Sequence, residues 1–590
     1  MTIDLGFAWL PLSSGEVIGI IDVPGHKDLI RNVIAGVWGL DAALLVIAAD
    51  DGWMPQTEEH LQILDLLRIE HGIVALTKVD LIDDPNWLDL VEEDIQRRLK
   101  GTRLSGAPLV RVSAKEGTNI QELRRNIEEL ISKIAPKIDI GRPCLPIDRV
   151  FTIKGSGTVV TGTLIDGHLS QGEKVTIFPK NLQTRIRALE SYKEKTDKAQ
   201  PGTRVALNLV GLEKEGLKRG DILFGREGQV RSSKILDTRV ELISQLAYPI
   251  KSNTELTVYL GAREILGRVI WFGRQSLRAG ESAFAQLRFK EPVATRIGDR
   301  FIIRKPSPAE TIGGGTVLDP LAGKHKFKDI DKVIPFLQRR INLEIEELIL
   351  SELDKNKYIK GEEILVASHY SPAEVASCVR LLQNKNKLIV VGSWVIDSTH
   401  WQKQIVKVLD ILATEHSIHP LWKGLPQAEL QNRLGLPMEL CNELITTLIN
   451  QGKIVRDRGI IALSTHKARL SPEQESVVSN ILELFERSRT SPPTERELAI
   501  QIPGSEEIVR FMCQQNMLVE LPEGVLFEYE HYESVKNEIM NFLKRNGTIS
   551  IQQVRTLLGF SRKYILPLLS KLDQEEVTRR LGDERVLVKV

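Results

Sequence analysis

Cysteine is scarce in this 590-residue chain, and charge of the two signs is almost balanced. Its four cysteines are scattered without metal-ligand spacing, which indicates no disulfide framework and fits a reducing compartment. No apolar run approaches the ~20 residues that a membrane span needs, so we predict a cytoplasmic protein without a membrane partner. The formal net charge of +1 means that any nucleic-acid surface is a local patch. The cysteines are Cys144, Cys378, Cys441 and Cys513.

The sequence also lacks Gly-Lys-Ser and Gly-Lys-Thr, the endings of the phosphate-binding loop G-x-x-x-x-G-K-[ST]. What it does contain is an apolar run, 17–21, that leads into Asp22, Val23, Pro24, Gly25 and His26. This pattern predicts a buried strand that ends at the ligand-binding edge of an α/β sheet. There Asp22 would hold a magnesium ion, Gly25 would let the backbone approach a phosphate, and His26 would position water. An ordinary Pro-Gly turn is the alternative.

Strands and helices alternate along residues 1–137, which predicts a doubly wound parallel α/β domain. The run 41–50 is apolar enough to be a fully buried strand of this sheet. Further strands are expected at 72–76 and 109–112, and helices at 27–34, 55–67, 88–99 and 120–134.

Polar clusters follow three of these expected strands. A carboxylate such as Asp80 accepts hydrogen bonds from guanine N1–H and N2–H₂, which adenine cannot offer. A lysine stem such as Lys78 covers a base, and a Ser-Ala turn points backbone N–H groups at the guanine oxygen. One cluster is weak evidence, but three in order strongly indicate a guanine nucleotide site. The clusters are Asp22/Gly25/His26, Thr77/Lys78/Asp80 and Ser113/Ala114/Lys115.

On these motifs the block resembles the G domain of translational GTPases. The resemblance implies GTP/GDP and Mg²⁺ as cofactors, with Thr2 and Asp22 as the metal site. It implies that His26 positions the attacking water, with full activity on the ribosome. The family usually has Asn where this chain has Thr77, a shorter side chain. By the same resemblance, the guanine-binding residues are Thr77, Lys78, Asp80, Ser113, Ala114 and Lys115.

Compared with that family, the first strand, the phosphate loop and the first helix are missing, because the chain begins at the switch motif. We therefore expect an N-terminally incomplete G domain that exposes apolar edges and binds GTP poorly or not at all.

After residue 137 the pattern changes to short strands with glycine turns, which predicts two β-barrels, 138–228 and 229–321. Most glycines here, including those of 311–320, are expected to be ordinary turns. The segment 151–162 resembles the second domain of elongation factor Tu-like proteins. That resemblance places Phe7, Asp148, Arg149 and Arg204 in an aminoacyl-tRNA pocket. Two arginines there suit an anionic side chain such as a selenolate, as in selenocysteine-specific elongation factors; arginines on a barrel surface are the alternative.

The last 260 or so residues show a loose repeat of three helices and a hairpin, which predicts tandem winged helices. The limits are 322–399, 400–465, 466–530 and 531–590. Hairpins are expected at 388–391 with 394–396, 454–456 with 460–463, 518–520 with 525–527, and 577–580 with 585–588.

The final repeat has eleven Lys and Arg against seven Asp and Glu. Helices are expected at 551–558 and from Ser561, as N-cap, to Leu572. Basic residues on the second helix and on the wing suit phosphate contacts, although a solvated charged face is the alternative. The repeat resembles the mRNA-hairpin-binding end of bacterial selenocysteine-specific elongation factors. The expected contacts are Arg562, Lys563, Arg579, Arg580 and Arg585.

The resemblance covers the whole chain and implies a monomeric bacterial factor that delivers selenocysteinyl-tRNA to the ribosome. Delivery would occur at recoded UGA codons through an mRNA hairpin and would end with GTP hydrolysis. Two alternatives stay open. One is a translational GTPase with another cargo, and the other is an RNA-binding adaptor without GTPase activity.

Overall fold

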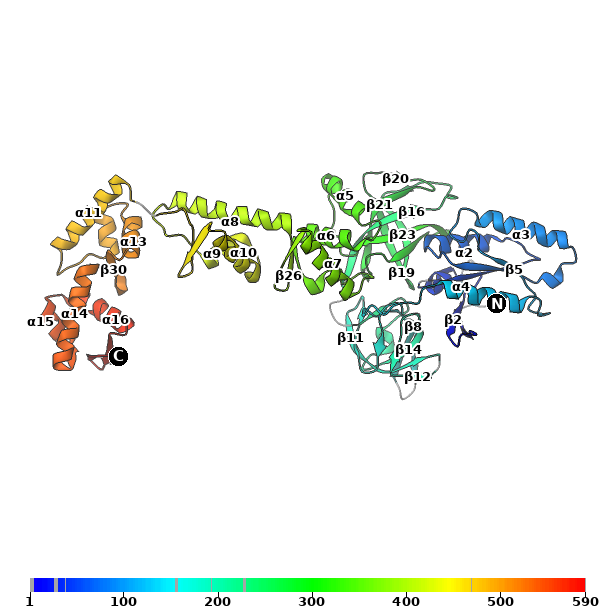
Figure 1. Cartoon of the computed structure of the whole chain (residues 1–590), viewed down its shortest axis with the longest axis horizontal. Helices are drawn as coiled ribbons and strands as arrows, with labels where there is room; N and C mark the ends of the chain where they lie inside the picture. Colours follow the sequence, from blue (N-terminus) through cyan, green and yellow to red (C-terminus); the bar gives the residue numbers. More distant parts are fainter. Residues whose placement is uncertain are drawn as a thin grey trace. The chain divides into compact units, whose positions relative to one another are not determined.

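The computed structural model describes residues 5–25, 30–37, 39–153, 157–192, 194–225, 230–467 and 470–588. The chain divides into two compact units, Met1–Ser398 and Thr399–Val590 (Figure 1). Within the described ranges, no helix is both long and apolar enough to cross a membrane. Thr2 and His26, expected at the nucleotide site, lie outside the described residues.

The predicted α/β domain is confirmed by a parallel sheet in the order β3-β4-β5 (Ala43–Ala48, Gly72–Thr77, Leu109–Arg111). β4 is buried from Gly72 to Leu76 because it pairs with a strand on each side. Helices alternate with these strands: α1 (Ile30–Val37), α2 (Pro55–Leu66), α3 (Pro85–Leu99) and α4 (Ile120–Lys133).

Two predictions about buried strands in this domain are wrong. The segment Val17–Asp22 forms β2, which pairs with β1 (Gly6–Pro11) in a separate two-stranded sheet and is largely exposed. β3 is an edge strand, so Leu44 and Val46 are 45% and 58% exposed. Each strand lacks a neighbour on one side among the described residues, which leaves apolar side chains in solvent.

The first barrel is confirmed as a sheet in the order β6-β15-β10-β11-β14-β8-β7, with β12 (Glu194–Thr196) added on β11. Its apolar side chains form one core that includes Val160, Ile177 and Leu207. A two-stranded sheet, β9 (Leu169–Ser170) with β13 (Lys198–Ala199), is formed by segments between these strands, and Leu169 and Ala199 belong to the same core. The main strands are β6 (Cys144–Pro146), β7 (Arg149–Ile153), β8 (Gly157–Thr163), β10 (Lys174–Phe178), β11 (Leu182–Ser191), β14 (Arg204–Leu209) and β15 (Ile222–Phe224).

The second barrel is closed, in the order β16-β21-β19-β18-β22-β23. Its glycines correct another expectation, because Gly313, Gly314 and Gly315 lie inside β23 and not in turns. A Cβ on Gly315 would lie 2.1 Å from the Arg239 carbonyl oxygen, so only glycine fits there. The strands are β16 (Ser232–Leu242), β18 (Thr254–Leu260), β19 (Arg263–Trp271), β21 (Ser282–Ala294), β22 (Arg300–Lys305) and β23 (Glu310–Asp319).

Helices and hairpins of the winged-helix type follow the barrels. All four hairpins predicted from the sequence are confirmed as β25–β26, β28–β29, β30–β31 and β33–β34. The first group holds α5 (Ile330–Arg339), α6 (Ile345–Asn356), α7 (Pro372–Asn384), β24 (Tyr358–Lys360), β25 (Leu388–Val391) and β26 (Trp394–Asp397).

The second unit contains the other three hairpins. All but the first residue of the long helix α8 (Ser398–Ile418) belong to it. This helix is followed by β27 (Leu425–Pro426), α9 (Gln427–Leu434), α10 (Met438–Asn450), β28 (Ile454–Asp457) and β29 (Ile460–Leu463). Next come α11 (Pro472–Arg487), α12 (Glu495–Gln501), α13 (Glu506–Gln514), β30 (Leu518–Glu520) and β31 (Leu526–Glu528). The last are α14 (Tyr529–Asn546), β32 (Thr548–Ser550), α15 (Ile551–Leu558), α16 (Arg562–Gln574), β33 (Thr578–Leu581) and β34 (Glu584–Leu587).

Candidate nucleotide and RNA sites

The turns after β4 and β5 lie next to each other at one edge of the parallel sheet. Val112 N donates to Leu76 O at 2.8 Å, and Val79 N donates to Val112 O at 3.4 Å. The two predicted guanine-binding clusters, Thr77/Lys78/Asp80 and Ser113/Ala114/Lys115, therefore meet. The predicted metal and phosphate residues Asp22 and Gly25 lie at and just after the end of the separate hairpin strand β2.

Hydrogen bonds hold several side chains in place at this edge of the sheet. Lys78 adopts φ 57° and its Nζ donates to Asp50 at 2.9 Å. That hydrogen bond raises the pKa of Lys78 and lowers the pKa of Asp50. Thr77 Oγ1 donates to Ile47 O at 3.2 Å, so the short side chain is tied to β3. Ser113 is fully buried and its Oγ accepts a hydrogen bond from Glu116 N at 3.1 Å.

The outer part of the same edge is open to a ligand. Asp80 is half-buried in the short helical turn Val79–Leu81, and Ala114 and Lys115 are exposed. A carboxylate beside exposed backbone N–H groups can bind a guanine base by its N–H groups and its oxygen. This end therefore fits guanine.

The four residues predicted for the aminoacyl pocket come together around one aromatic ring. The Arg204 guanidinium lies 3.3 Å from the centre of the Phe7 ring, and the Arg149 guanidinium lies 5.1 Å from it. Arg204 forms a two-point ion pair with Asp148, whose Oδ1 also accepts a hydrogen bond from Thr161 at 2.7 Å. A guanidinium over an aromatic face is favourable, so the ring helps to orient both arginines.

The adjoining hollow on the first barrel is more cationic than the sequence motif indicates. It has a volume of about 550 Å³, and its wall carries Lys214, Lys218 and Arg219 beside Asp148 and Arg149. Arg219 Nη1 donates to Asn32 Oδ1 at 2.8 Å, which links the hollow to α1. The sequence motifs did not predict Lys214, Lys218 and Arg219 at this site. The only local signal for them is the density of charge in the segment 213–219.

The predicted mRNA-contact residues separate into two groups. Arg562, Lys563, Arg579 and Arg580 are exposed, on the first turn of α16 and on β33. Lys563 is held by Glu497 of α12 at 3.0 Å, and this hydrogen bond raises its pKa. Arg585 is buried, and its Nε donates to Asp573 at 3.0 Å. Arg585 therefore connects the wing to α16 and offers little surface for a phosphate contact.

Family models match the chain in the order in which these domains occur. "Elongation factor Tu GTP binding domain" matches residues 1–133, and "Elongation factor Tu domain 2" matches 157–224. "Selenocysteine-specific elongation factor, beta-barrel domain" matches 237–324. "Elongation factor SelB, winged helix" models match 409–463 and 541–587. A G domain with two such barrels defines a translational GTPase.

Relatives that match this chain over its whole length identify one kind of translational GTPase. A "Selenocysteine-specific elongation factor" of Desulfomicrobium baculatum is 34% identical over all of this chain and 94% of its own length. The protein of that name from Escherichia coli K12 is 31% identical over all of this chain and 93% of its own length. The crystal structure of a bacterial selenocysteine-specific elongation factor, EF-Sec, has a TM-score of 0.70 at 25% identity, covering all of this chain and 93% of that one. The chain belongs to the family of selenocysteine-specific elongation factors.

Proposed function

We propose that this chain carries selenocysteinyl-tRNA, bound with GTP and Mg²⁺, to ribosomes at recoded UGA codons marked by an mRNA hairpin. The observation that carries the proposal is the pair of arginines around Phe7, in a chain of this family. Asp148 neutralises one arginine charge, so the group keeps one positive charge for an anionic aminoacyl side chain. We propose that the protein is a cytoplasmic monomer. For its domains we propose the limits that were predicted from the sequence.

At the nucleotide site, the guanine base would be held by Asp80 and Lys78, with Thr77, Ser113, Ala114 and Lys115 beside it. Asp22 and Thr2 would bind Mg²⁺, Gly25 would contact the terminal phosphate, and His26 would position water. The adjacent turns after β4 and β5 support the guanine end. The phosphate end rests on the motif alone.

The cargo proposal predicts that Arg149→Gln, which leaves the ion pair of Arg204 with Asp148 in place, weakens selenocysteinyl-tRNA more than seryl-tRNA. A charge-assisted hydrogen bond is worth about 1.5–3 kcal/mol, so we expect a tenfold or larger selective loss. The measurement is protection of each aminoacyl ester from hydrolysis in a GTP-bound complex. Arg185→Gln, an exposed arginine on β11, is the matched control. Equal loss for both aminoacyl-tRNAs would refute the role in selecting charge.

The exposed basic residues on α16 and β33 would also suit the alternative function, an RNA-binding adaptor without GTPase activity. Titration with a fluorescent GDP analogue separates the two functions. One sample is this chain, and the second carries a G-x-x-x-x-G-K-[ST] segment fused before Met1. If the fused protein binds the GDP analogue and this chain does not, and if Asp80→Asn removes that binding, the result supports the GTPase. Binding by neither sample, with hairpin RNA still bound, supports the adaptor.

A further inference from the structure

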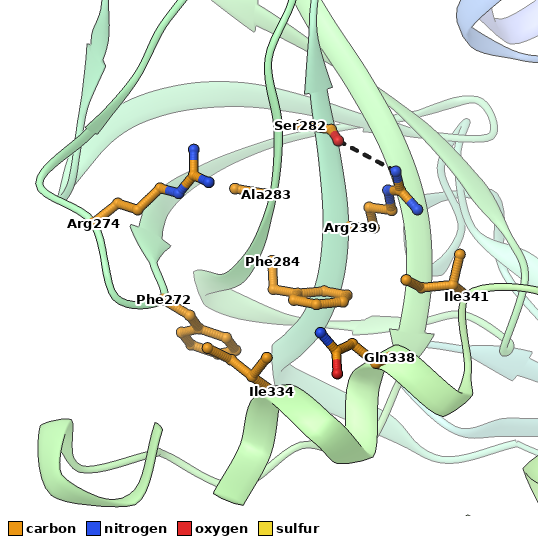
Figure 2. A pocket seen from close by; sticks show the side chains of 9 residues that line it. All are labelled: Arg239, Phe272, Arg274, Ser282, Ala283, Phe284, Ile334, Gln338 and Ile341. Carbon is orange, nitrogen blue, oxygen red and sulfur yellow. Dashed lines mark hydrogen bonds between the residues drawn. The ribbon is translucent and has the colours of Figure 1, made fainter. Parts of the chain in front are cut away.

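A hollow of about 320 Å³ lies between the closed barrel and helix α5. In Figure 2, Phe284 lies between Arg239 and Arg274, with the Gln338 amide close to its ring. This volume is at the lower end of the ~300–1,000 Å³ found for small-ligand pockets. The full lining is Arg239, Phe272, Arg274, Ser282, Ala283, Phe284, Ile334, Gln338 and Ile341.

Strand pairing places Arg239, which lines the hollow, in a row of residues on the outside of the barrel. Arg239 on β16 lies opposite Phe284 on β21 and opposite Thr316 on β23, and Thr316 lies opposite Arg300 on β22. Directly paired residues point to the same face of a sheet. The neighbours Val240 and Phe301 belong to the barrel core, so this row faces outward.

Positive charge along the row is incompletely neutralised. Arg239 Nη2 donates to Ser282 Oγ at 3.3 Å, and no carboxylate of a described residue forms an ion pair with Arg239. Arg274 lies 3.6 Å from the exposed carboxylate of Glu281. Burial, together with the charges of Arg68, Arg103 and Arg239, lowers the pKa of Arg300 to about 10 although Glu241 opposes the shift. The row therefore favours an anion.

The apolar floor of the hollow is built into the fold. Phe272, Leu318 and Leu337 form a small buried cluster, and Phe284 packs against it. Arg340, fully buried at the end of α5, donates to Leu318 O at 2.9 Å and to Ser351 Oγ at 3.0 Å. These bonds fix α5 against the barrel, so the hollow exists without a ligand.

We propose that this hollow binds one nucleoside phosphate, with its base against Phe284 and its phosphate on Arg239 and Arg274. An aromatic face stacks on a base, and guanidinium groups bind phosphate at two points. The Gln338 amide can hydrogen-bond the edge of the base. The volume suits one nucleotide and not a stacked strand, so the ligand is a free mononucleotide. This site is separate from the guanine site and does not depend on the proposed function.

The test uses ADP, because the Asp80 carboxylate is suited to guanine and not to adenine. Equilibrium dialysis of the full chain measures binding, and photolabelling with 8-azido-ADP followed by peptide mapping locates it. We expect labelled peptides within 272–284 or 330–341. We expect Arg239→Gln to weaken ADP about tenfold and Phe284→Leu about fivefold or more. Arg268→Gln, an exposed arginine on β19, should leave binding unchanged.

Three results would overturn the proposal. The first is no ADP binding at millimolar concentration. The second is label that maps only outside the two segments. The third is a pair of observations: inorganic phosphate binds as tightly as ADP, and Phe284→Leu does not change ADP binding. In that case the aromatic floor would contribute nothing to binding. Both variants keep side chains that the barrel tolerates, and the far-ultraviolet circular dichroism spectrum checks their fold.

Discussion

Arginines of equal charge have different roles in the last winged helix, and only their surroundings distinguish them. Arg579 and Arg580 are exposed on β33, whereas Arg585 on β34 is buried against Asp573. Asp573 also accepts a hydrogen bond from Thr578 Oγ1 at 2.7 Å. The carboxylate of α16 thus holds both strands of the wing, and the proposed RNA contacts belong to the exposed pair.

Asp573→Ala should therefore loosen the wing. Removing one member of a largely buried pair leaves the other charge without compensation, which costs roughly 2 kcal/mol here. We expect thermolysin to cleave the segment 578–587 faster under native conditions. Asp583→Ala removes an exposed carboxylate from the same wing and should change little. Similar cleavage rates for the two variants would contradict the structural role of Asp573.

Arg579→Ala and Arg580→Ala should weaken hairpin RNA without affecting the fold. Each lost phosphate contact lowers the slope of log affinity against log salt by about 1. The measurement is a filter-binding titration at several salt concentrations. Arg487→Ala, an arginine 80% exposed on α11, is the control. An unchanged slope would place the RNA elsewhere on the tail.

At the scale of elements, local patterns predicted the helices and hairpins well. The wing β33–β34 was predicted because its two strands are close in sequence and flank the Gly582 turn. The burial of Val17–Asp22 was predicted wrongly, because burial depends on neighbouring strands and not on the apolar run itself. The Gly313–Gly315 strand was also missed, since close approach to another strand leaves no sign in the local sequence.

The two serines before α15 and α16 show a further limit of sequence patterns. Both occupy the N-cap position, as predicted for Ser561. Ser550 Oγ accepts a hydrogen bond from Gln553 N at 3.3 Å, and Gln553 Oε1 accepts one from Ser550 N at 2.8 Å. In the described structure the Ser561 side chain makes no such capping bond.

Ser550→Ala should therefore destabilise its helix and Ser561→Ala should not. Loss of a capping hydrogen bond costs about 1 kcal/mol, which corresponds to roughly fivefold faster amide exchange in residues 551–558. Hydrogen exchange read by mass spectrometry measures both helices in the full chain. A larger effect of Ser561→Ala would reverse the assignment.

At the scale of the first unit, one group of charges, buried except for its histidine, joins both barrels to the first winged helix. Arg296 of the second barrel contacts Asp166 of the first at 2.6 Å and Asp299 at 3.5 Å. His369 of the winged helix lies 3.0 Å from Asp299 and 3.5 Å from Asp166. Arg142 adds hydrogen bonds to Leu365 O and Ser368 Oγ. These partners are far apart in the sequence, so no local pattern predicted them.

This junction gives a prediction for the pH dependence of stability. Burial and the Arg296 charge lower the pKa of His369, but hydrogen bonds to Asp166 and Asp299 outweigh them and raise it. A raised pKa in the folded state means that protonated His369 stabilises the fold. This stabilisation is complete below the unfolded value of about 6.5 and is lost as pH rises through the folded-state pKa. The side chain is 40% exposed, so screening limits the effect to about 1 kcal/mol.

His369→Gln should remove this dependence. Scanning calorimetry of the full chain at pH 6, 7 and 9 measures it as the difference in melting temperature between wild type and variant. We expect the wild type to be more stable at pH 6 and the difference to shrink by pH 9, because the neutral imidazole binds the two carboxylates only weakly. His71→Gln, an exposed histidine of the G domain, is the control and should show no such trend. A difference that grows with pH would mean that neutral His369, and not its protonated form, holds the three domains together.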